Sequence, residues 1–595
     1  MAATTFPSLI LGAFLAAVSL YMLKTILQFL ENRHYAKKMG IPILYSPVGR
    51  FNPLWILLAP ILTPIIRKAP FGLGTWTEYV AYNWAWEDQG RTHQKLGKVF
   101  AHVSPSEIIL WAADVDVIRQ VYSRKKSFEK SEAAHKTMPV LLSPSVSSVS
   151  GAEWQRQRRI TAPPFNENNM TIVWHESLRQ TRDMCELWSS AGEQGLKSCA
   201  RDTMTLALNV LAAAGLGLKW DFTPAGHKLE GEDEFSAMYR DNLTPLITNL
   251  ATLVLTPRWL YKYGPKFASY LPRMFGEHVV MAKTFRSLMR ELVETRRAEI
   301  KAGKATENIF LNAIISKSLL DSSQKSDEKD AEENATLRSA LSEDEVFGNM
   351  IDYNIAGHET TAHTLNYCFH ILSVEPQWQK WIQEELDHVF AGSPSIDPET
   401  LNYGETFYRL KRCLALMFEM LRVYPPVLTH SKQCLAPKGR GQELHIDGRT
   451  IYVPAETTIC LPAYSVQMLP EYWGPDSREW KPSRWIQQQD NKINSNDYKA
   501  SLADTLESET ISPPPIAKET FFPWSLGARD CPGKKFAQVE FVIVVAYVLR
   551  HYNLEAVPLP GETFQDTRKR IWDYTRDSIS QITIHVREPD KYALR

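Results

Sequence analysis

The sequence has few cysteines for its length, and none of them is arranged as a pair. Seven cysteines are scattered over 595 residues, with no Cys-x-x-Cys motif among them. An odd, scattered set argues against both a structural zinc site and a disulfide framework. Lys plus Arg and Asp plus Glu are both 67, so the formal net charge is zero. This balance gives no support for a nucleic-acid-binding protein.

Two common cofactor motifs are also missing. The chain has neither a Walker motif for nucleoside triphosphates nor a Rossmann fingerprint for dinucleotides, and it has no internal repeat. We therefore expect no flavin or nicotinamide site within the chain. The hydrophobic content of 44% is that of a folded protein with a large core.

Long hydrophobic runs are rare, and the clearest one lies at the N-terminus. Ser8 to Leu30 is almost wholly apolar and is about long enough to cross a hydrocarbon layer of about 30 Å as a tilted helix. The basic residues lie at or beyond its C-terminal end: Lys24, Arg33, Lys37 and Lys38. This asymmetry predicts a retained anchor over residues 1–35 with a cytosolic chain behind it. A cleaved signal peptide is the alternative, although the positive n-region is missing.

A second apolar segment, Phe51 to Ile66, contains Pro53, Pro60 and Pro64. Three prolines argue against a second membrane-spanning helix. Two interpretations stay open: a segment that rests on the bilayer surface near the substrate entrance, or a segment packed in the core. Residues 36–79 are therefore interpreted as a linker with a candidate membrane-surface segment.

From about residue 80 the chain has a mainly helical pattern with a few short β segments. Lys98 to Val103 and Glu107 to Trp111 are the clearest expected strands. Two hydrophilic stretches interrupt the pattern. Residues 317–342 are predicted to form an exposed loop, and residues 487–520 a surface insertion.

The longest expected helix begins after a capping box at residues 342–345 and extends to about residue 374. Gly357 in its middle costs about 1 kcal/mol against Ala, which predicts that something approaches the backbone closely there. Glu359 and Thr360 place an acid and an alcohol beside this point. The alternative is a Gly/Thr helix kink with a solvated glutamate.

The segment Phe522 to Gly533 contains Cys531 in a tight loop just before a long apolar run. Gly527 and Gly533 have no side chains, so the backbone can turn sharply and a large flat ligand can lie against it. A cysteine that enters a helix N-terminus is favoured as the thiolate. Arg529 can reach an anion on the same ligand. These features predict the proximal thiolate ligand of a haem iron, whereas the alternative is an ordinary buried thiol, as expected for the other six cysteines.

This segment resembles the cysteine loop of the cytochrome P450 superfamily, whose usual form is Phe-x-x-Gly-x-Arg-x-Cys-x-Gly. Trp524 stands in place of the leading phenylalanine, and another aromatic ring there is expected to shield the sulfur. Four further segments match family motifs in the family's order: Trp154 with Arg158, Ala356–Thr360, Glu419 with Arg422, and Pro482–Trp485. The resemblance covers the chain from about residue 80 to its end.

The resemblance implies that Trp154 and Arg158, which lie one helical turn apart, hold a haem propionate. Arg156 and Arg159 between and beside them fit a solvated basic turn. The resemblance also implies that Thr360, with Glu359, helps to deliver protons during dioxygen reduction.

The family also has a second residue that contacts a haem propionate, and a triad of residues with a structural role. Lys432 stands near the position of the second contact, with His430 as the alternative. Glu419 and Arg422, three residues apart on one helix face, match two members of a structural triad that locks the core behind the haem. Arg484 matches the third member.

The resemblance implies a mainly α-helical haem-thiolate domain with a small β-rich part over residues 80–595, preceded by a single N-terminal transmembrane helix. A microsomal type implies a single-pass protein of the endoplasmic reticulum with a cytosolic catalytic domain. Haem b and O2 are the implied cofactor and co-substrate. NADPH-cytochrome P450 reductase would supply the electrons, with cytochrome b5 as a further donor. In the segment Pro-Gly-Lys-Lys-Phe that follows the cysteine, the sequence resembles fungal enzymes of secondary metabolism.

The implied reaction inserts one oxygen atom into an apolar small molecule, such as a terpenoid or polyketide. Two alternatives are a haem-thiolate isomerase or dehydratase that needs neither O2 nor a reductase, and a membrane-anchored haem carrier or sensor without enzymatic activity. Substrate contacts are expected from residues 131–150, from residues 211–255 and from the region after Pro426, where no residue pattern identifies the substrate.

Overall fold

The computed structural model describes residues 5–50, 52–81, 83–130, 143–223, 235, 237–239, 256, 258–304, 309–324, 340–392, 396, 401–437, 439–488, 501–580 and 582–595. The chain forms two compact units. The first combines residues 1–134, 428–475 and 519–522, and the second combines 135–427, 476–518 and 523–595. The boundaries expected near residues 35 and 79 both lie within the first unit, and the expected catalytic domain contributes to both units.

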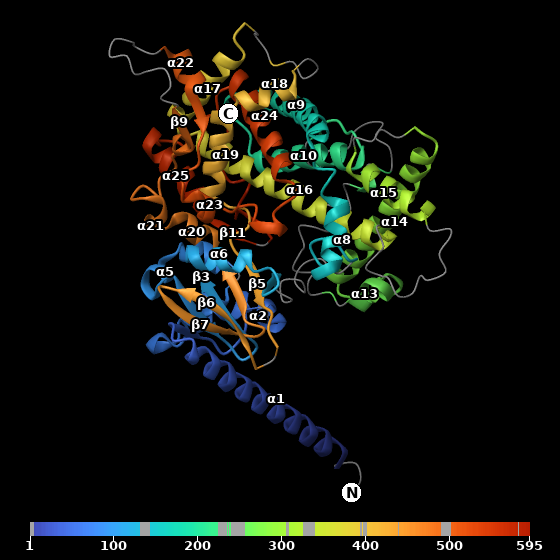
Figure 1. Cartoon of the computed structure of the whole chain (residues 1–595), viewed down its shortest axis with the longest axis vertical. Helices are drawn as coiled ribbons and strands as arrows, with labels where there is room; N and C mark the ends of the chain where they lie inside the picture. Colours follow the sequence, from blue (N-terminus) through green and yellow to red (C-terminus); the bar gives the residue numbers. More distant parts are fainter. Residues whose placement is uncertain are drawn as a thin grey trace. The chain divides into compact units, whose positions relative to one another are not determined.

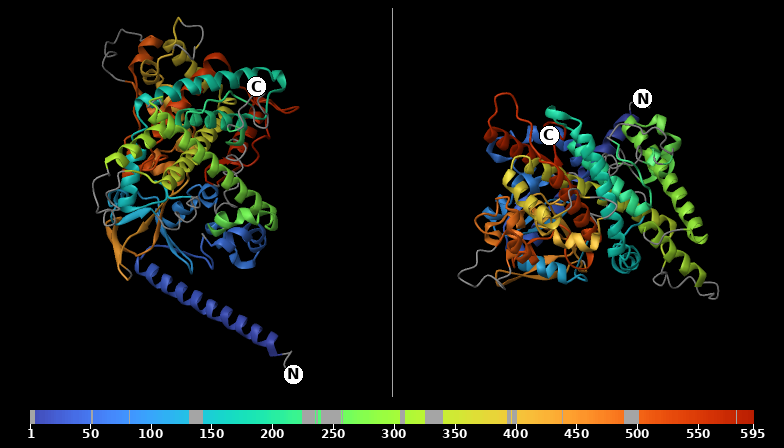
Figure 2. Two further views of the ribbon diagram at one scale, coloured as in Figure 1. Left: turned by 90° about the vertical axis from the view of Figure 1, so that its right-hand side faces the viewer. Right: turned by 90° about the horizontal axis from the view of Figure 1, so that it is seen from above.

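The first unit is built around a six-stranded sheet with the order β1-β2-β3-β8-β5-β4. Strands from the two ends of the unit's sequence lie side by side in it (Figures 1 and 2). Its elements are α1 (Thr5–Lys38), β1 (Ile43–Tyr45), α2 (Pro53–Ile66), α3 (Trp76–Val80), α4 (Trp84–Asp88), α5 (Arg91–Leu96), β2 (Val99–Val103), β3 (Ile108–Ala112), α6 (Val115–Ser123), β4 (Phe128–Lys130), β5 (His430–Cys434), β6 (Gly441–Ile446), β7 (Arg449–Pro454), β8 (Thr458–Leu461), α20 (Ala463–Met468) and α21 (Pro470–Trp473).

The two strands expected from the sequence are present as β2 and β3. They pair antiparallel, with Phe100 opposite Trp111, and every residue of both strands is buried. Burial on both faces explains why these strands consist almost wholly of apolar residues. β3 then pairs parallel with β8, which brings the distant segment around residue 460 into the same sheet.

The N-terminal helix differs from the expected anchor. α1 is helical over the whole of Ser8 to Leu30, yet the described residues contain no helix that is long and apolar enough to span a membrane. α1 continues past residue 35 to Lys38, and its last turns pack against the sheet of the first unit. Ala36 and Met39 are buried against the β2–β3 sheet, and Asn32 Nδ2 donates to the carbonyl of Ser104 at 3.0 Å.

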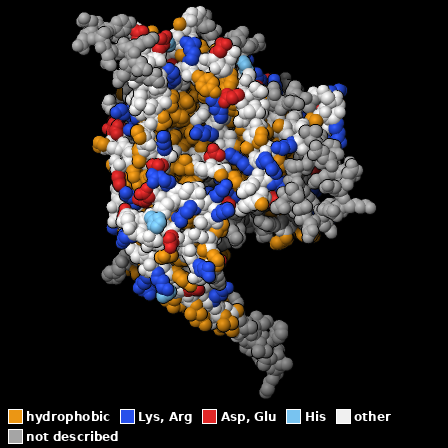
Figure 3. All heavy atoms as spheres, in the orientation of Figure 1, with side chains coloured by type: hydrophobic (Ala, Val, Ile, Leu, Met, Phe, Trp, Pro, Cys, Tyr) orange, Lys and Arg blue, Asp and Glu red, His pale blue; other side chains and the backbone are white. Residues whose placement is uncertain are grey.

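The second apolar segment is the helix α2, capped by the side chain of Asn52. Trp55 is buried, whereas Leu54, Ile61 and Ile65 are 68%, 65% and 64% exposed. The face of α2 that carries Leu54, Ile61 and Ile65 is therefore not packed in the core. Apolar side chains are also exposed along the described part of α1 (Figure 3).

The second unit is mainly helical. Its elements are α8 (Gly151–Thr161), α9 (Glu167–Ser189), α10 (Cys199–Leu211), α13 (Arg258–Tyr263), α14 (Arg273–Lys301), α15 (Phe310–Gln324), α16 (Glu343–Leu372), α17 (Pro376–Val389), α18 (Tyr403–Thr406), α19 (Lys411–Val423), β9 (Ile486–Gln488), α22 (Leu502–Ser508), β10 (Glu509–Ile511), α24 (Lys534–His551), α25 (Phe564–Arg576), β11 (Ser578–Ser580) and β12 (Ile584–Val586). The short helix α23 (Ala517–Thr520) lies where the two units meet in the sequence. The mainly helical fold with a small β part is as the sequence predicted.

The central helix α16 organises this unit. Its predicted capping box is present: Ser342 Oγ accepts from the backbone of Glu345, whose carboxylate accepts from the backbone of Ser342. Helices α10 and α24 pack along it (Figure 1). At about 1.5 Å per residue, its 30 residues extend about 45 Å.

Both expected polar loops are more ordered than predicted. In the first, α15 continues to Gln324, because a run of polar helix formers does not by itself end a helix whose first turns are buried. In the second, a capping box of Ser501 and Asp504 starts α22, and β10 pairs with β9. Residues 325–339 and 489–500 of these stretches lie outside the described residues. So do residues 131–142 and most of 224–255, where substrate contacts are expected.

Candidate haem site

Cys531 lies in a closed loop between the short 3₁₀ turn Gly527–Arg529 and the start of α24. Its backbone N–H donates to the carbonyl of Trp524 at 2.9 Å, which closes the loop. Gly527 has φ +74°, a conformation that glycine adopts without strain. The local sequence therefore fixes a half-buried thiol just before a helix N-terminus.

A pocket of about 380 Å³ opens beside this thiol. It is lined by Arg158, Ala162, Phe165, Asp530, Cys531, Pro532, Lys534, Lys535 and Gln538. A Cβ atom at Gly533 would meet only ordinary contacts, with the sulfur at 3.8 Å and Phe165 at 3.9 Å. The protein itself does not crowd this glycine, so its missing side chain leaves space next to the sulfur.

The thiol is not held as a thiolate by the helix terminus alone, which corrects the prediction from the sequence. Burial raises the pKa of Cys531 above its ordinary value. The backbone N–H of Gly533 and the charge of Arg158 lower this pKa, but they do not outweigh burial. Because a metal binds the deprotonated sulfur, an iron ion would itself favour the thiolate.

Two guanidinium groups and an indole gather at the cysteine loop. Arg529 lies over the ring of Trp154 at 4.5 Å and donates to the carbonyl of Val149 at 3.0 Å. Arg158 forms an ion pair with Asp530 at 2.9 Å, next to the cysteine. The structure thus brings Trp154, Arg158 and Arg529 together at this loop. A soft sulfur ligand with two nearby cations fits haem, which presents an iron ion and two carboxylates.

The opposite face of α8 is buried, which the sequence analysis missed. Arg156 is 7% exposed and forms ion pairs with Glu153 and Glu345. Interpreting Arg156 as part of a solvated basic turn is therefore wrong, whereas Arg159 is exposed as expected. The spacing indicates that Arg156 lies on another face of the helix, because residues two apart do not share a face and Arg156 is two residues from both Trp154 and Arg158.

Gly357 in α16 is explained by helix packing. A Cβ atom there would lie 3.0 Å from both δ carbons of Leu211 in α10, closer than almost all real contacts. The close approach predicted from the sequence is therefore made by a neighbouring helix. α16 is also continuous from Glu343 to Leu372, so neither a break nor a helix end at Gly357 is present.

Thr360 and Glu359 occupy different environments one residue apart. Thr360 is half-buried, and its hydroxyl donates to the carbonyl of Ala356, an exposed residue one turn earlier, at 2.9 Å. Glu359 is only 8% exposed, so interpreting it as a solvated glutamate is wrong. Burial raises the pKa of Glu359 to about 7, and the hydroxyl of Thr583 donates to its Oε2 at 3.3 Å.

Thr583 is a site residue that the sequence analysis did not find. It lies between β11 and β12, and 224 positions separate it from its glutamate partner. No motif marks this short hairpin, so only the tertiary structure reveals the contact.

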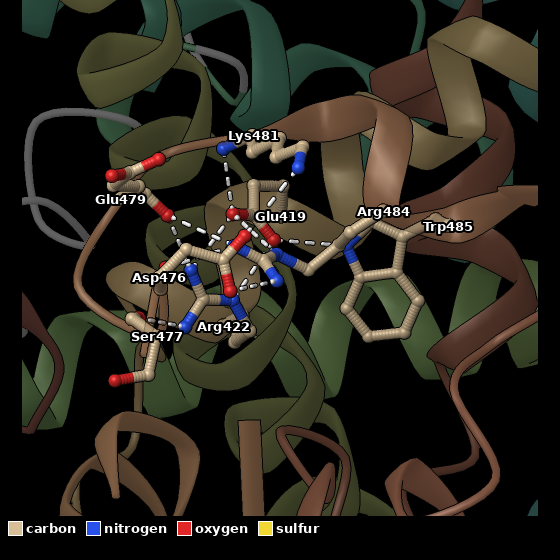
Figure 4. A network of polar contacts seen from close by, with 8 residues as sticks. All are labelled: Glu419, Arg422, Asp476, Ser477, Glu479, Lys481, Arg484 and Trp485. Carbon is tan, nitrogen blue, oxygen red and sulfur yellow. Dashed lines mark hydrogen bonds and ion pairs between the residues drawn. The ribbon is translucent and has the colours of Figure 1, made fainter. Parts of the chain in front are cut away.

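The Glu419 network joins α19 to the segment that precedes β9 (Figure 4). Glu419 and Arg422 are both fully buried and form two hydrogen bonds, at 2.8 and 2.9 Å. Arg484 donates to the same carboxylate at 3.2 Å and Trp485 Nε1 at 3.0 Å. Burial would raise the pKa of Glu419, but Arg422 and Arg484 outweigh burial and lower it. The three members expected from the sequence are in contact.

The candidates for the second propionate contact belong to the first unit. Lys432 lies in β5, with its ammonium group 5.2 Å from the ring centre of Tyr122. His430 is half-buried at the start of the same strand, and desolvation of its ring lowers its pKa to about 4. A role for either residue at the haem stays a prediction.

Comparison with known proteins agrees with these features. The cytochrome P450 family model matches residues 73–572. The chain is 29% identical over 576 residues to a cytochrome P450 monooxygenase of Arthrobotrys oligospora, covering 95% of this chain and 94% of the relative. It is 24% identical over 587 residues to the phomenoic acid biosynthesis cluster cytochrome P450 monooxygenase of Leptosphaeria maculans, covering 93% and 94%. A crystal structure of a cytochrome P450 superposes with a TM-score of 0.60 at 16% identity, covering 87% of this chain and 98% of that one. The chain belongs to the cytochrome P450 family of haem-dependent, dioxygen-using monooxygenases.

Proposed function

We propose that this enzyme inserts one oxygen atom of O2 into an apolar small molecule of secondary metabolism, at the cytosolic face of the endoplasmic reticulum membrane. Its electrons come from a separate NADPH-cytochrome P450 reductase, with cytochrome b5 as a further donor. The observation that carries the proposal is the meeting of Cys531, Arg158, Arg529 and Trp154 at one loop beside a pocket. The relative named for phomenoic acid biosynthesis supports secondary metabolism.

The residues of the site have distinct roles in this proposal. Haem, when bound, supplies the iron chemistry that activates dioxygen. Cys531 would ligate the iron, and Arg158 and Arg529 would neutralise the haem carboxylates. Arg158 would then exchange its ion pair with Asp530 for a propionate. Trp154 holds the guanidinium of Arg529 in place by stacking.

Glu359 and Thr360 are the proposed groups for proton movement. A general acid works best when its pKa lies near the working pH, and burial places the pKa of Glu359 at about 7. The Thr360 hydroxyl donates to the carbonyl of Ala356 and can accept a second hydrogen bond. Both residues would be needless in a haem carrier, and an isomerase would not need them for dioxygen reduction.

The decisive experiment measures product with purified reductase, NADPH and candidate apolar metabolites. The carbon monoxide complex of the reduced enzyme should show the red-shifted Soret band of a thiolate-ligated haem, and Cys531→Ser should lose it. Cys434→Ser, at a buried cysteine of β5, is the matched control and should keep it. Product formed without NADPH and reductase would favour the isomerase. Haem binding with no turnover of any substrate class would favour the carrier.

Reductase docking is proposed at the N-terminus of α24. Lys534 is exposed next to Cys531, with its ammonium group 5.4 Å from the ring centre of Trp524, whereas Lys535 pairs with Glu167 at 3.8 Å and donates to Tyr408. The docking charge is therefore assigned to Lys534, with Arg159 as a second exposed cation. Lys534→Glu should slow the first electron transfer at low salt without changing haem content, and the difference should shrink as salt screens it. An unchanged rate at low salt would place docking elsewhere.

Membrane association is proposed through the exposed apolar faces of α1 and α2. A deletion that tests it should end at Leu30, because Asn32, Ala36 and Met39 hold the rest of α1 to the sheet. We expect the truncated protein to stay partly on membranes, and the added change Ile61→Asp in α2 to release it. Complete release by the truncation alone would show that α2 makes no membrane contact.

A further inference from the structure

The C-terminal hairpin β11–β12 contacts the central helix at the proposed proton donor. Thr583, 3% exposed, donates to Glu359 at 3.3 Å. One turn further along α16, the ring of His363 stacks on that of His585 with centroids 5.2 Å apart and planes at 24°. Residues four apart share a helix face, so the hairpin lies along the face of α16 that carries Glu359.

The contact decides how the Glu359 carboxyl is held. A buried carboxylate needs hydrogen-bond donors, because a charge without them is costly in a protein interior. The neighbouring alcohol on α16 does not serve Glu359, since Thr360 donates to Ala356. The hydroxyl of Thr583 is the donor that the structure provides for this group.

We infer that Thr583 is a positioning residue for the monooxygenase reaction: its hydroxyl holds the Glu359 carboxyl in one orientation and sets how readily that group gives up its proton. The inference rests on the proposed role of Glu359. It makes the short hairpin, which carries no recognisable motif, part of the proton-delivery apparatus.

The direction of the effect follows from the two causes that act on Glu359. Burial raises its pKa to about 7, and the Thr583 hydrogen bond lowers it by favouring the ionised form. Loss of the hydroxyl should therefore raise the pKa further. The titratable neighbours on α16 and the hairpin are His358, His363 and His585, and burial lowers the pKa of each. These histidines are therefore neutral around pH 7. On the packed helix α24, burial raises the pKa of Glu540 to about 8.

The test compares Thr583→Val, which replaces the hydroxyl by a methyl group of similar size, with Thr583→Ser, which keeps a hydroxyl. Two quantities are followed against pH in the holoenzyme. One is product formed per NADPH, and the other is the infrared C=O band of protonated Glu359, identified by subtracting the spectrum of Glu359→Gln. In Thr583→Val both midpoints should move up by about one pH unit, the size expected for losing a hydrogen bond to a charged group. Thr583→Ser should stay close to the wild type.

His585→Phe is the matched control, because it removes the ring nitrogen that contacts the backbone carbonyl of Thr583 at 3.2 Å but keeps an aromatic ring against His363 and keeps the Thr583 hydroxyl. Its midpoints should not move. If the infrared midpoint of Thr583→Val equals that of the wild type, or if His585→Phe moves it equally, the inference is wrong. If Thr583→Val does not take up haem, Thr583→Ala provides the same comparison without a branched side chain. A wild-type enzyme without NADPH-dependent product would overturn the proposed function, while the infrared titration would still decide whether Thr583 controls Glu359.

Discussion

Glu419 and Glu359 are both buried carboxyl groups of the helical unit, yet their surroundings are opposite. Glu419 receives hydrogen bonds from two arginines, the indole of Trp485 and the backbone of Lys481. Among the described residues, Glu359 receives one, from the hydroxyl of Thr583. The pKa of Glu419 is lowered, and that of Glu359 is raised to about 7.

The difference shows what separates a structural carboxylate from one suited to proton transfer. A fully paired charge is locked in one protonation state and joins distant segments, here α19 and the segment around Arg484. A carboxyl with a single donor stays close to the point where it can gain or lose a proton near neutral pH. Burial alone therefore does not fix the protonation state of a carboxyl group, because the charges and hydrogen-bond donors around it also act on its pKa.

The largest expected effect comes from breaking the paired network. Glu419→Gln removes the negative charge that Arg422 and Arg484 share, and leaves Arg484 with its longer ion pair to Asp476 at 3.4 Å. Breaking a buried pair in this way costs about 3–5 kcal/mol. We expect little folded, haem-containing protein, measured by haem content and by the thermal midpoint. The double variant Glu419→Leu with Arg422→Met removes a charge of each sign and should recover part of this loss. A stable, haem-replete Glu419→Gln protein would contradict a structural role for the network.

The same substitution at the other glutamate should spare the fold. Glu359→Gln keeps the size of the side chain and its ability to accept from Thr583, so haem content and thermal midpoint should match the wild type. Product formation should fall about 10²-fold, the typical contribution of a general acid or base. The check is the rate of product formation at saturating substrate and reductase. A stability loss as large as that of Glu419→Gln would show that Glu359 is structural as well.

A smaller effect is expected at the neighbouring alcohol. Thr360→Ala removes the hydroxyl but keeps a good helix former, so the fold should survive. Product per NADPH should fall about fivefold, as for one lost hydrogen bond of about 1 kcal/mol, while NADPH consumption continues and peroxide rises. Peroxide and NADPH are measured in the same reaction. Unaltered coupling would mean that Glu359 or the substrate delivers the proton without Thr360.

Local motifs made much of this site predictable from the sequence. The cysteine loop, the capped helix α16 and the pair Glu419 and Arg422 depend on spacing within one segment, where helix geometry and turn chemistry decide the outcome. Arg484 came from a family motif in a second segment. These parts appear in the structure as expected.

The rest of the site depends on contacts between distant segments, and the spacing of residues within one segment does not predict such contacts. Gly357 signals a close approach, but only the structure shows that Leu211 of α10 makes it. Thr583 has no local signal, and the burial of Arg156 depends on where α8 packs against the start of α16. The packing of Ala36 and Met39 has no local signal either, because the partners of these apolar residues lie in the sheet.

The smallest expected effect extends the comparison to a third buried glutamate. Glu540 in α24 is fully buried, and neither of its oxygens makes a hydrogen bond of ordinary geometry within the described part of the chain. Burial raises its pKa to about 8, and the nearby hydroxyl of Thr361 only lowers it in part. Glu540 is therefore expected to be protonated in the folded enzyme at neutral pH.

This proton makes stability depend on pH with a definite sign. The folded state keeps the proton up to about pH 8, whereas the unfolded chain loses it near the ordinary value of 4.5. The stabilisation of the folded state by this proton is complete below pH 4.5. It is lost as the pH rises towards 8, by up to about 1.4 kcal/mol per pH unit. Glu540→Gln should flatten the fall of the thermal midpoint with pH over this window. Glu359→Gln is the matched control, since its own window ends near pH 7, so only Glu540→Gln should flatten the slope between 7 and 8. An unchanged slope in that interval would mean that Glu540 is ionised in the folded enzyme and has a donor or counter-charge there.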